Sequence, residues 1–227
     1  MDTKLAIRYS VRETMGLVAM AVALFWSAGT IDWWPGWAAL AVMAGWITAT
    51  AIVIFRFNPS LLAERLGPRR GAKPWDMAIM SILGLTQLAR YIVAGLDKRY
   101  GWTDGFPFTA QVIALAICVL GYALVVWATA SNPFFSQIVR IQPERGHTVV
   151  TAGPYRYVRH PAYIGAILFE LAVPVLLASW GVLAISGLGA LLLIIRTALE
   201  DHTLQTELLG YVDYSRQVRH RLVPGIW

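Results

Sequence analysis

Residues 153–165 read GPYRYVRHPAYIG, which places two arginines, one histidine and three tyrosines within thirteen positions. Gly153-Pro154 interrupts regular structure. The proline that follows His160 pushes this histidine out of the helical region, and Pro161 is well suited to be the first residue of a helix. We therefore expect a turn against a helix N-terminus. Its free N–H groups, together with the cationic side chains, would suit a carboxylate or a phosphate.

A second group of polar residues follows the last apolar run of the chain. Arg196 and Glu200 are four residues apart, so on a helix they would share a face and could form an ion pair. Asp201 comes next. Glu207, Tyr211 and Tyr214 fall on roughly the same face as Glu200 if the helix continues, although Gly210 is a residue that could end it.

These two groups match the chemistry of S-adenosylmethionine. Its α-carboxylate would suit Arg159, His160 or a helix N-terminus, and its ribose hydroxyls would suit Glu200 or Asp201. Tyrosine rings could hold the adenine or the cationic sulfonium. The phosphates of a dinucleotide would suit the same arginines, so these residues alone do not choose between the two ligands.

The run GPYRYVRHPAYIG resembles the signature of the isoprenylcysteine carboxyl methyltransferase family, which is related to the membrane phospholipid N-methyltransferases. The shared pattern is a Gly-Pro-Tyr turn, then Arg-His-Pro-x-Tyr-x-Gly, then an acidic pair on the last helix. A tyrosine-rich stretch after a glycine (210–214 here) and a proline near the end, Pro224, complete it. The resemblance covers about residues 131–227. The second acid is often glutamate in the family, so the shorter Asp201 puts its contact in doubt.

The resemblance implies a methyltransferase that takes its methyl group from S-adenosylmethionine and its lipophilic acceptor sideways from the bilayer. The cofactor contacts that we predict are Gly153, Pro154, Tyr155, Tyr157, Arg159, His160, Pro161, Tyr163, Gly165, Glu200 and Asp201. For a carboxylate acceptor, the catalytic group would be a cation that holds it in line, Arg196 or Arg159. For an amine acceptor, Glu200 or Glu207 could remove the proton. The sequence does not choose between these acceptors.

Long apolar runs must position these residues. The chain of 227 residues is 57% hydrophobic and 14% charged, whereas a soluble domain has about 25% charged residues. Six runs approach or exceed the roughly 20 residues needed to cross a bilayer: 14–32, 34–55, 76–96, 107–130, 162–179 and 180–198. We predict an all-α, polytopic transmembrane bundle of about six spans. It forms one domain, 1–227, in which a four-span part, 1–130, precedes the cofactor-binding part, 131–227.

The charges predict the orientation. If the six spans are correct, 16 of the 19 lysines and arginines lie on one side of the membrane, and such residues stay on the cytoplasmic side. Both termini and the active site are therefore expected to be cytoplasmic, with the cell inner membrane as the expected location. The net charge of +6 then reflects topology, and we expect no nucleic-acid partner.

Two other classes of function stay open. An NADPH-dependent membrane reductase of the sterol type would share an Arg-His-Pro-x-Tyr turn, but such enzymes commonly have Asn where this chain has Ala162. A transporter or scaffold would more often show inverted repeats or interrupted spans.

The sequence also supports predictions about several single residues outside these two groups. Arg90 and Glu170, both inside spans, could pair with each other or line a polar substrate path. Leu61, Leu62 and Leu66 have the spacing of a short helix on the membrane surface. The four histidines lack metal-site spacing, so no metal is predicted. His147 and His202 are expected at the surface, and Cys118 in the core.

Overall fold

The computed structural model describes residues 2–67 and 71–227, and all regular structure in these ranges is helical. Arg69 and Arg70, part of the basic loop expected after the second span, lie outside them. The helices are α1 (Thr3–Ala28), α2 (Trp34–Phe57), α3 (Ser60–Leu66), α4 (Pro74–Tyr100), α5 (Phe108–Ser131), α6 (Pro161–Leu176), α7 (Trp180–Glu207) and α8 (Tyr211–Gln217). Two 3₁₀ turns, η1 (Pro143–Arg145) and η2 (Gly153–Arg156), lie between α5 and α6.

The chain is an all-α, multi-pass membrane protein. Five helices, α1, α2, α4, α5 and α7, are long and apolar enough to cross a bilayer, and α6 is a shorter apolar helix of 16 residues. At 1.5 Å per residue α6 rises about 24 Å, less than the hydrocarbon thickness of about 30 Å. The structure thus has five helices that are long enough to span the bilayer and a sixth, shorter apolar helix. This agrees with the prediction of about six spans. The first helix begins at Thr3, well before the predicted start at residue 14.

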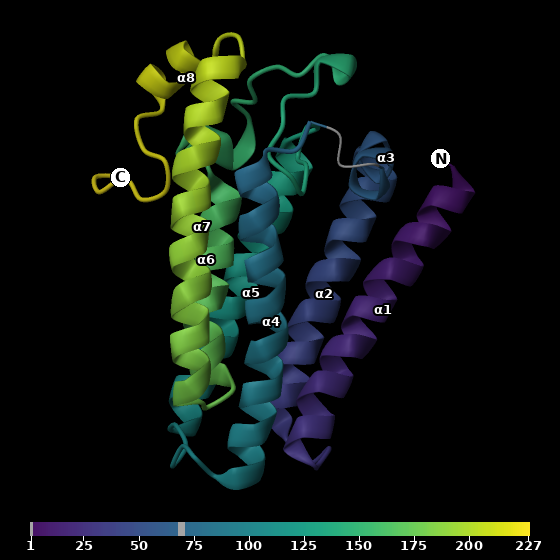
Figure 1. Ribbon diagram of the computed structural model, residues 1–227. Helices are drawn as coiled ribbons and strands as arrows, with labels where there is room; N and C mark the ends of the chain where they lie inside the picture. Colours follow the sequence, from purple (N-terminus) through teal and green to yellow (C-terminus); the bar gives the residue numbers. More distant parts are fainter. Residues whose placement is uncertain (1, 68–70) are drawn as a thin grey trace.

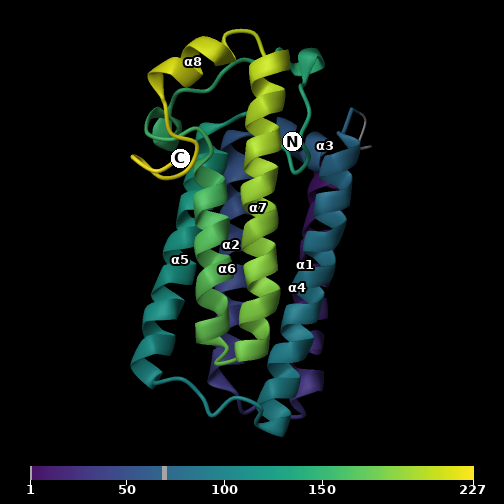
Figure 2. The ribbon, with the colours of Figure 1, turned by 60° about the vertical axis from the view of Figure 1, so that its left-hand side comes forward.

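The long helices run side by side and leave the polar segments at one end (Figure 1). The N-terminus, α3, the segment between α5 and α6, α8 and the C-terminus all lie at this end, which we call the basic end. The α4–α5 loop lies at the opposite end in both views (Figure 2). α3 is present as expected, but Leu61 and Leu62 are buried against Tyr9 and Ile54 rather than lying on a membrane surface.

At the opposite end, Asp97 holds three segments together. Its carboxylate accepts hydrogen bonds from the backbone N–H and the hydroxyl of Thr103, both at 2.8 Å, and from the Ser179 hydroxyl at 2.5 Å. Ser179 also caps α7 by accepting a hydrogen bond from the Val182 N–H at 3.3 Å. The tight α6–α7 turn is thereby fixed to the end of α4, which explains how α6 can be short.

α5 and α6 approach each other closely at two glycines. A Cβ atom on Gly165 would lie 2.2 Å from the carbonyl oxygen of Gly121, and a Cβ on Gly121 would lie 2.6 Å from that of Gly165. Small residues allow such backbone contact between membrane helices. Gly165 thus sets the position of α6, whose first residues carry the tyrosine and histidine of the polar motif.

We predict that Gly165→Ala will lower the thermal stability of the protein in detergent by several degrees. The new methyl group would meet backbone rather than a movable side chain, and overpacking of this kind costs about 1–3 kcal/mol. Thermal unfolding followed by size-exclusion fluorescence measures the effect. The matched control is Gly187→Ala on α7, where a Cβ would have nothing within 4 Å. Equal melting temperatures of the two variants would contradict this account of α5–α6 packing.

Candidate active site

A cavity of about 470 Å³ opens among α4, α6, α7 and the segment that joins α5 to α6. This volume lies in the range of small-molecule sites. Its wall at the basic end is polar and aromatic, with Tyr155, His160, Tyr163, Arg196, Glu200 and Tyr211. Toward the middle of the bundle the wall becomes mostly apolar, with Trp46, Met80, Leu83, Val125, Phe169 and Leu193. One cavity therefore joins a polar region to the interior of the helix bundle.

The Gly153–Pro161 segment forms the turn that the sequence predicts. Gly153 adopts φ +58°, and a Cβ there would lie 2.1 Å from the Ser131 hydroxyl oxygen. His160 has non-helical φ and ψ of −129° and 61°, and α6 begins at Pro161, so both expectations are confirmed. The backbone N–H groups of Arg159 and His160 each donate at 3.0 Å to carbonyls of the C-terminal tail, residues 220 and 221. The turn is thus joined to the end of the chain.

Asp201 is the centre of the hydrogen-bond network behind the cavity, and it has no exposed surface. Arg159 donates to both of its carboxylate oxygens, at 2.7 and 2.9 Å, and Arg221 donates at 2.8 Å. The Tyr211 hydroxyl donates at 3.0 Å, and His160 Nε2 lies 3.1 Å away. Such charge-assisted contacts are what a buried carboxylate requires.

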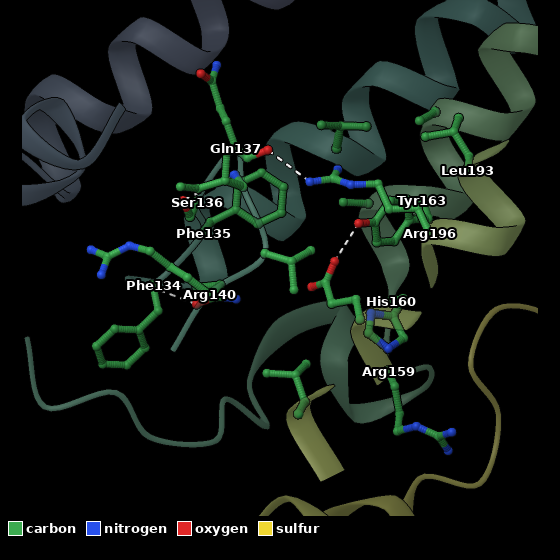
Figure 3. A pocket seen from close by; sticks show the side chains of 18 of the residues that line it. Phe134, Phe135, Ser136, Gln137, Arg140, Arg159, His160, Tyr163, Leu193 and Arg196 are labelled. Carbon is green, nitrogen blue, oxygen red and sulfur yellow. Dashed lines mark hydrogen bonds between the residues drawn. The ribbon is translucent and has the colours of Figure 1, made fainter. Parts of the chain in front are cut away.

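Arg159 is occupied by this network. Besides its two bonds to Asp201, its Nη1 donates to the Val218 and Arg219 carbonyls, both at 2.8 Å. The side chain is buried, and in Figure 3 it points away from Tyr163 and Arg196. These four hydrogen bonds hold Arg159 in the wall of the cavity, so it is not a membrane-surface anchor.

Arg196 does not pair with Glu200, which corrects the interpretation from their i, i+4 spacing. Its Nε donates to Asp76 at 2.6 Å, and its Nη2 donates to the Gln137 carbonyl at 2.9 Å (Figure 3). The guanidinium carbon also lies 5.5 Å from the centre of the Tyr163 ring. Among the residues that the structure describes, none accepts a hydrogen bond from Nη1, which is left for a ligand.

Glu200 contacts Tyr163 instead. The Tyr163 hydroxyl donates to Oε2 of Glu200, and both side chains line the cavity. Across the part of the chain with described coordinates, Oε1 of Glu200 has no hydrogen-bond partner. Glu200 therefore offers an accepting oxygen at the cavity wall, one helical turn beyond the Arg196 guanidinium.

The tyrosine hydroxyls of the loop and tail take part in hydrogen bonds: Tyr211 and Tyr214 donate, and Tyr155 accepts from Asn132 at 3.3 Å. Burial raises the pKa of Tyr155 and of Tyr214, and burial followed by the charge of Asp201 raises the pKa of Tyr211. Tyr214 donates to the Tyr155 carbonyl at 2.6 Å and so fixes the turn. All three hydroxyls keep their protons at neutral pH, which excludes them as general bases there.

α7 ends at Glu207, and Gly210, with φ +83°, separates it from α8. Gly210 thus ends the helix as considered from the sequence, and Glu207 is exposed and bonded to Lys73 at 2.5 Å. Glu207 does not line the cavity, in contrast to Tyr211 and Tyr214. Because α7 ends there, α8 folds back, and Tyr211 and Tyr214 contact His160 and Tyr155 of the 153–165 motif.

Residues 134–150 form a wall of the cavity. The sequence placed this segment in the cofactor-binding part, 131–227, but none of its residues was predicted as a site residue. Gln142 is buried and donates to the Phe134 carbonyl at 2.8 Å, and His147 lies against the Phe134 ring with centroids 4.6 Å apart. His147 is half-buried rather than a surface residue, and burial, then Arg145 and Arg140, lower its pKa. His202 is exposed as expected. The segment has no helical or strand periodicity, so no pattern could have revealed its role.

This wall is fixed to α3 by an ion pair. Arg140 donates to both carboxylate oxygens of Glu64, at 3.0 and 2.5 Å. The hydrogen bonds from Arg140 lower the pKa of Glu64 more than its burial raises it. Glu64 therefore stays charged at neutral pH, and the α5–α6 segment is held against the N-terminal half of the chain.

The predicted site residues separate into two groups. Those that line the cavity are Tyr155, Arg159, His160, Tyr163, Arg196 and Glu200. Those that do not are Gly153, Pro154, Tyr157, Pro161, Gly165 and Asp201. Tyr157 is 63% exposed, whereas Gly165 and Asp201 are buried behind the wall. Of the second group, Gly165 and Asp201 act on the site through the helices and the tail that they hold in place.

Arg90 and Glu170 lie at the end of the cavity inside the bundle. Arg90 Nη2 donates to Oε2 of Glu170, and both residues line the cavity. The pairing, one of the two alternatives considered from the sequence, is confirmed. Cys118 is buried in the core. Within residues 2–67 and 71–227, no group of three His, Cys, Asp or Glu residues could hold a metal ion.

Comparisons with known proteins agree with the motif. Residues 113–206 match the isoprenylcysteine carboxyl methyltransferase (ICMT) family. A probable protein-S-isoprenylcysteine O-methyltransferase of Oryza sativa subsp. indica is 28% identical over 141 residues, covering 59% of this chain and 71% of that protein. The Schizosaccharomyces pombe protein-S-isoprenylcysteine O-methyltransferase is 37% identical over 71 residues, covering 31% of this chain and 30% of that one. A solved structure of a eukaryotic intramembrane Ras methyltransferase aligns with 95% of this chain and with 86% of the chain in that structure. The sequence identity is 17% and the TM-score is 0.48.

We predict that Asp201→Asn will loosen the C-terminal tail and lower the melting temperature. Removing the carboxylate leaves Arg159 without its buried counter-charge, and breaking a buried pair costs about 3–5 kcal/mol. Limited trypsin digestion should then cleave after Arg219 and Arg221 faster than in the wild type. The control is Asp213→Asn, whose partner Arg216 is 76% exposed, and it should leave both measurements unchanged. Equal cleavage of the two variants would contradict the role of Asp201.

Proposed function

We propose that this chain, a membrane methyltransferase similar to the isoprenylcysteine carboxyl methyltransferase family, transfers the methyl group of S-adenosylmethionine to a lipophilic acceptor. The observation that carries the proposal is the cavity that joins a polar, tyrosine-rich wall to an apolar chamber between membrane helices. A polar donor and a lipophilic acceptor would need this combination. The printed names of the relatives support an acceptor related to isoprenylcysteine.

The polar part of the cavity fits the groups of S-adenosylmethionine. Oε1 of Glu200 can accept from ribose hydroxyls, and Tyr155, Tyr163 and Tyr211 offer aromatic faces for the adenine or the sulfonium. His160, held through Nε2, is the candidate for the α-carboxylate together with the first N–H groups of α6. Arg159 is not, because its guanidinium already makes four hydrogen bonds.

S-adenosylmethionine supplies an already activated methyl group. The protein mainly has to align the two reactants and exclude water. We place the reacting atoms near Tyr163, where Glu200 and Arg196 face the cavity one turn apart on α7. The carboxylate of Glu200 would also stabilise a positive sulfonium nearby.

The positions of Arg196, Glu200 and Glu207 favour some of the residues that the sequence offered for action on the acceptor over others. Arg196 keeps Nη1 free and can orient a carboxylate for in-line attack, and a carboxylate needs no base. If the acceptor is an amine, Glu200 is the candidate base, because Glu207 is exposed and away from the cavity. The free Nη1 of Arg196 favours the carboxylate, as in the O-methyltransferases that this chain resembles.

We further propose that the basic end faces the cytoplasm, where S-adenosylmethionine is made. The described part of the N-terminus, α3, the α5–α6 segment and the C-terminal tail share that end (Figure 1). Lys98 and Arg99 lie near the opposite end, at the end of α4. The asymmetry of lysine and arginine supports this orientation.

We predict that Glu200→Gln will bind S-adenosylmethionine about 10- to 100-fold more weakly than the wild type. The substitution keeps the shape but removes charge-assisted hydrogen bonds, each worth about 1.5–3 kcal/mol. Calorimetry on detergent-purified protein measures the dissociation constant. Glu207→Gln, which removes a carboxylate of the same helix outside the cavity, should bind like the wild type. NADPH is titrated in parallel, and binding of NADPH instead of S-adenosylmethionine would replace the proposal with a reductase.

We predict that Arg196→Lys will lower kcat/KM for a carboxylate acceptor about 10- to 100-fold while the dissociation constant of S-adenosylmethionine changes little. Lysine keeps the charge beside Asp76 but lacks the planar fork that can bind the carboxylate and Gln137 together. Transfer of labelled methyl into extracted lipid measures the rate, and release of the label by alkali identifies an ester. Arg216→Lys, at an exposed pair, is the control. An alkali-stable product would indicate N-methylation and overturn this role of Arg196.

A further inference from the structure

The apolar end of the cavity is closed by an ion pair inside the bundle. Arg90 on α4 and Glu170 on α6 are both in helices that lie in the membrane, and both line the cavity. Glu170 follows Tyr163 by seven residues on α6, so it lies about 10 Å deeper along the helix. Charges at this depth are costly, and they usually serve a function when they face a cavity.

The ion pair leaves N–H groups of Arg90 unused. Arg90 Nη2 donates to Glu170, and the guanidinium carbon lies 5.8 Å from the centre of the Phe169 ring. Arg90 Nε is buried and has no partner among the residues with described positions. Arg90 is 1% exposed, so water at the protein surface does not satisfy this N–H. A buried donor without a partner is uncommon and costs free energy.

The position of Glu170 is also built into the fold. A Cβ on Gly189 of α7 would lie 2.7 Å from Oε2 of Glu170, so in this structure the carboxylate lies directly against the glycine. Three helices, α4, α6 and α7, therefore shape this end of the cavity. A pair that served only to join α4 to α6 would need neither contact with the cavity nor an unused N–H.

The charge of the pair restricts what can bind beside it. Arg90 and Glu170 neutralise each other, so a second anion would leave a net charge in a dry, apolar chamber. A neutral oxygen adds no charge. It can accept from the unused N–H of Arg90, and a hydroxyl can also donate to Glu170.

We propose that this end of the cavity recognises a neutral oxygen, a hydroxyl or carbonyl, on the chain of the acceptor lipid, about 10 Å from the methyl-accepting group. The inference rests on the proposed methyl transfer and specifies its substrate class. The acceptor would then resemble an isoprenylcysteine in its accepting group but carry a neutral oxygen on its chain, rather than a plain hydrocarbon chain. The oxygen also fixes how far the chain enters and so places the accepting group near Tyr163.

The test uses fatty acids as probes on purified full-length protein in nanodiscs. Stearic acid is compared with hydroxystearic acids that carry the hydroxyl near, midway along and far from the carboxylate. Dissociation constants come from the ligand-dependent shift in melting temperature. The wild type should bind one mid-chain isomer about tenfold more tightly than stearic acid, as expected for a hydrogen bond with a charged partner.

The double variant Arg90→Met/Glu170→Met replaces the pair with apolar side chains of similar length, a change that buried pairs often tolerate. It should fold and bind S-adenosylmethionine like the wild type but lose the preference for the hydroxylated acid. Three results would overturn the inference. The wild type could bind all the acids equally, it could bind none of them, or the double variant could keep the preference for the hydroxylated acid. Failure of the wild type to bind S-adenosylmethionine in calorimetry would instead overturn the proposed function, since the fatty-acid comparison does not depend on that ligand.

Discussion

The buried carboxylate of Asp201 is the interaction on which the polar end of this protein depends. A charge without exposed surface is stable only when opposite charges and hydrogen bonds surround it. Its partners come from the turn before α6 (Arg159, His160), from α8 (Tyr211) and from the tail (Arg221). Because all of these must reach one side chain, the last turns of α7 position segments that are otherwise separate. The cavity wall is a consequence of that arrangement.

The motif at residues 153–165 therefore combines two kinds of residue. Tyr155, Arg159, His160 and Tyr163 border the cavity, and Arg159 also holds the tail. Gly165 lies outside the cavity and brings α6 against α5. Residues of the second kind are as closely constrained as those of the first, because a shift of α6 would move His160 and Tyr163 together. A substitution outside the cavity can thus act on the site through helix position.

The fold could be predicted from the sequence because a bilayer requires every spanning segment to satisfy its own backbone hydrogen bonds, so apolar length reveals helices. Local rules also placed Pro161 and His160 correctly. The partner of Arg196 could not be predicted: i, i+4 spacing favoured Glu200, but Asp76 lies 120 residues away on α4 and comes close only after folding. The individual residues of the wall at 134–150 could not be predicted for the same reason, since their contacts with distant residues leave no local periodicity.

Arg196 lies where the polar wall of the cavity meets the apolar chamber. Asp76 and the Gln137 carbonyl hold its guanidinium between the polar wall and the apolar chamber, so its charge is compensated before any ligand binds. A free cation at that level would attract water and anions without discrimination. A compensated guanidinium whose Nη1 is unused binds a group only where it lies in front of that nitrogen. In the proposed reaction, this restriction lets a lipophilic acceptor meet a polar donor at one level of the cavity. The same principle, a compensated charge that keeps unused N–H groups, recurs deeper in the bundle at Arg90.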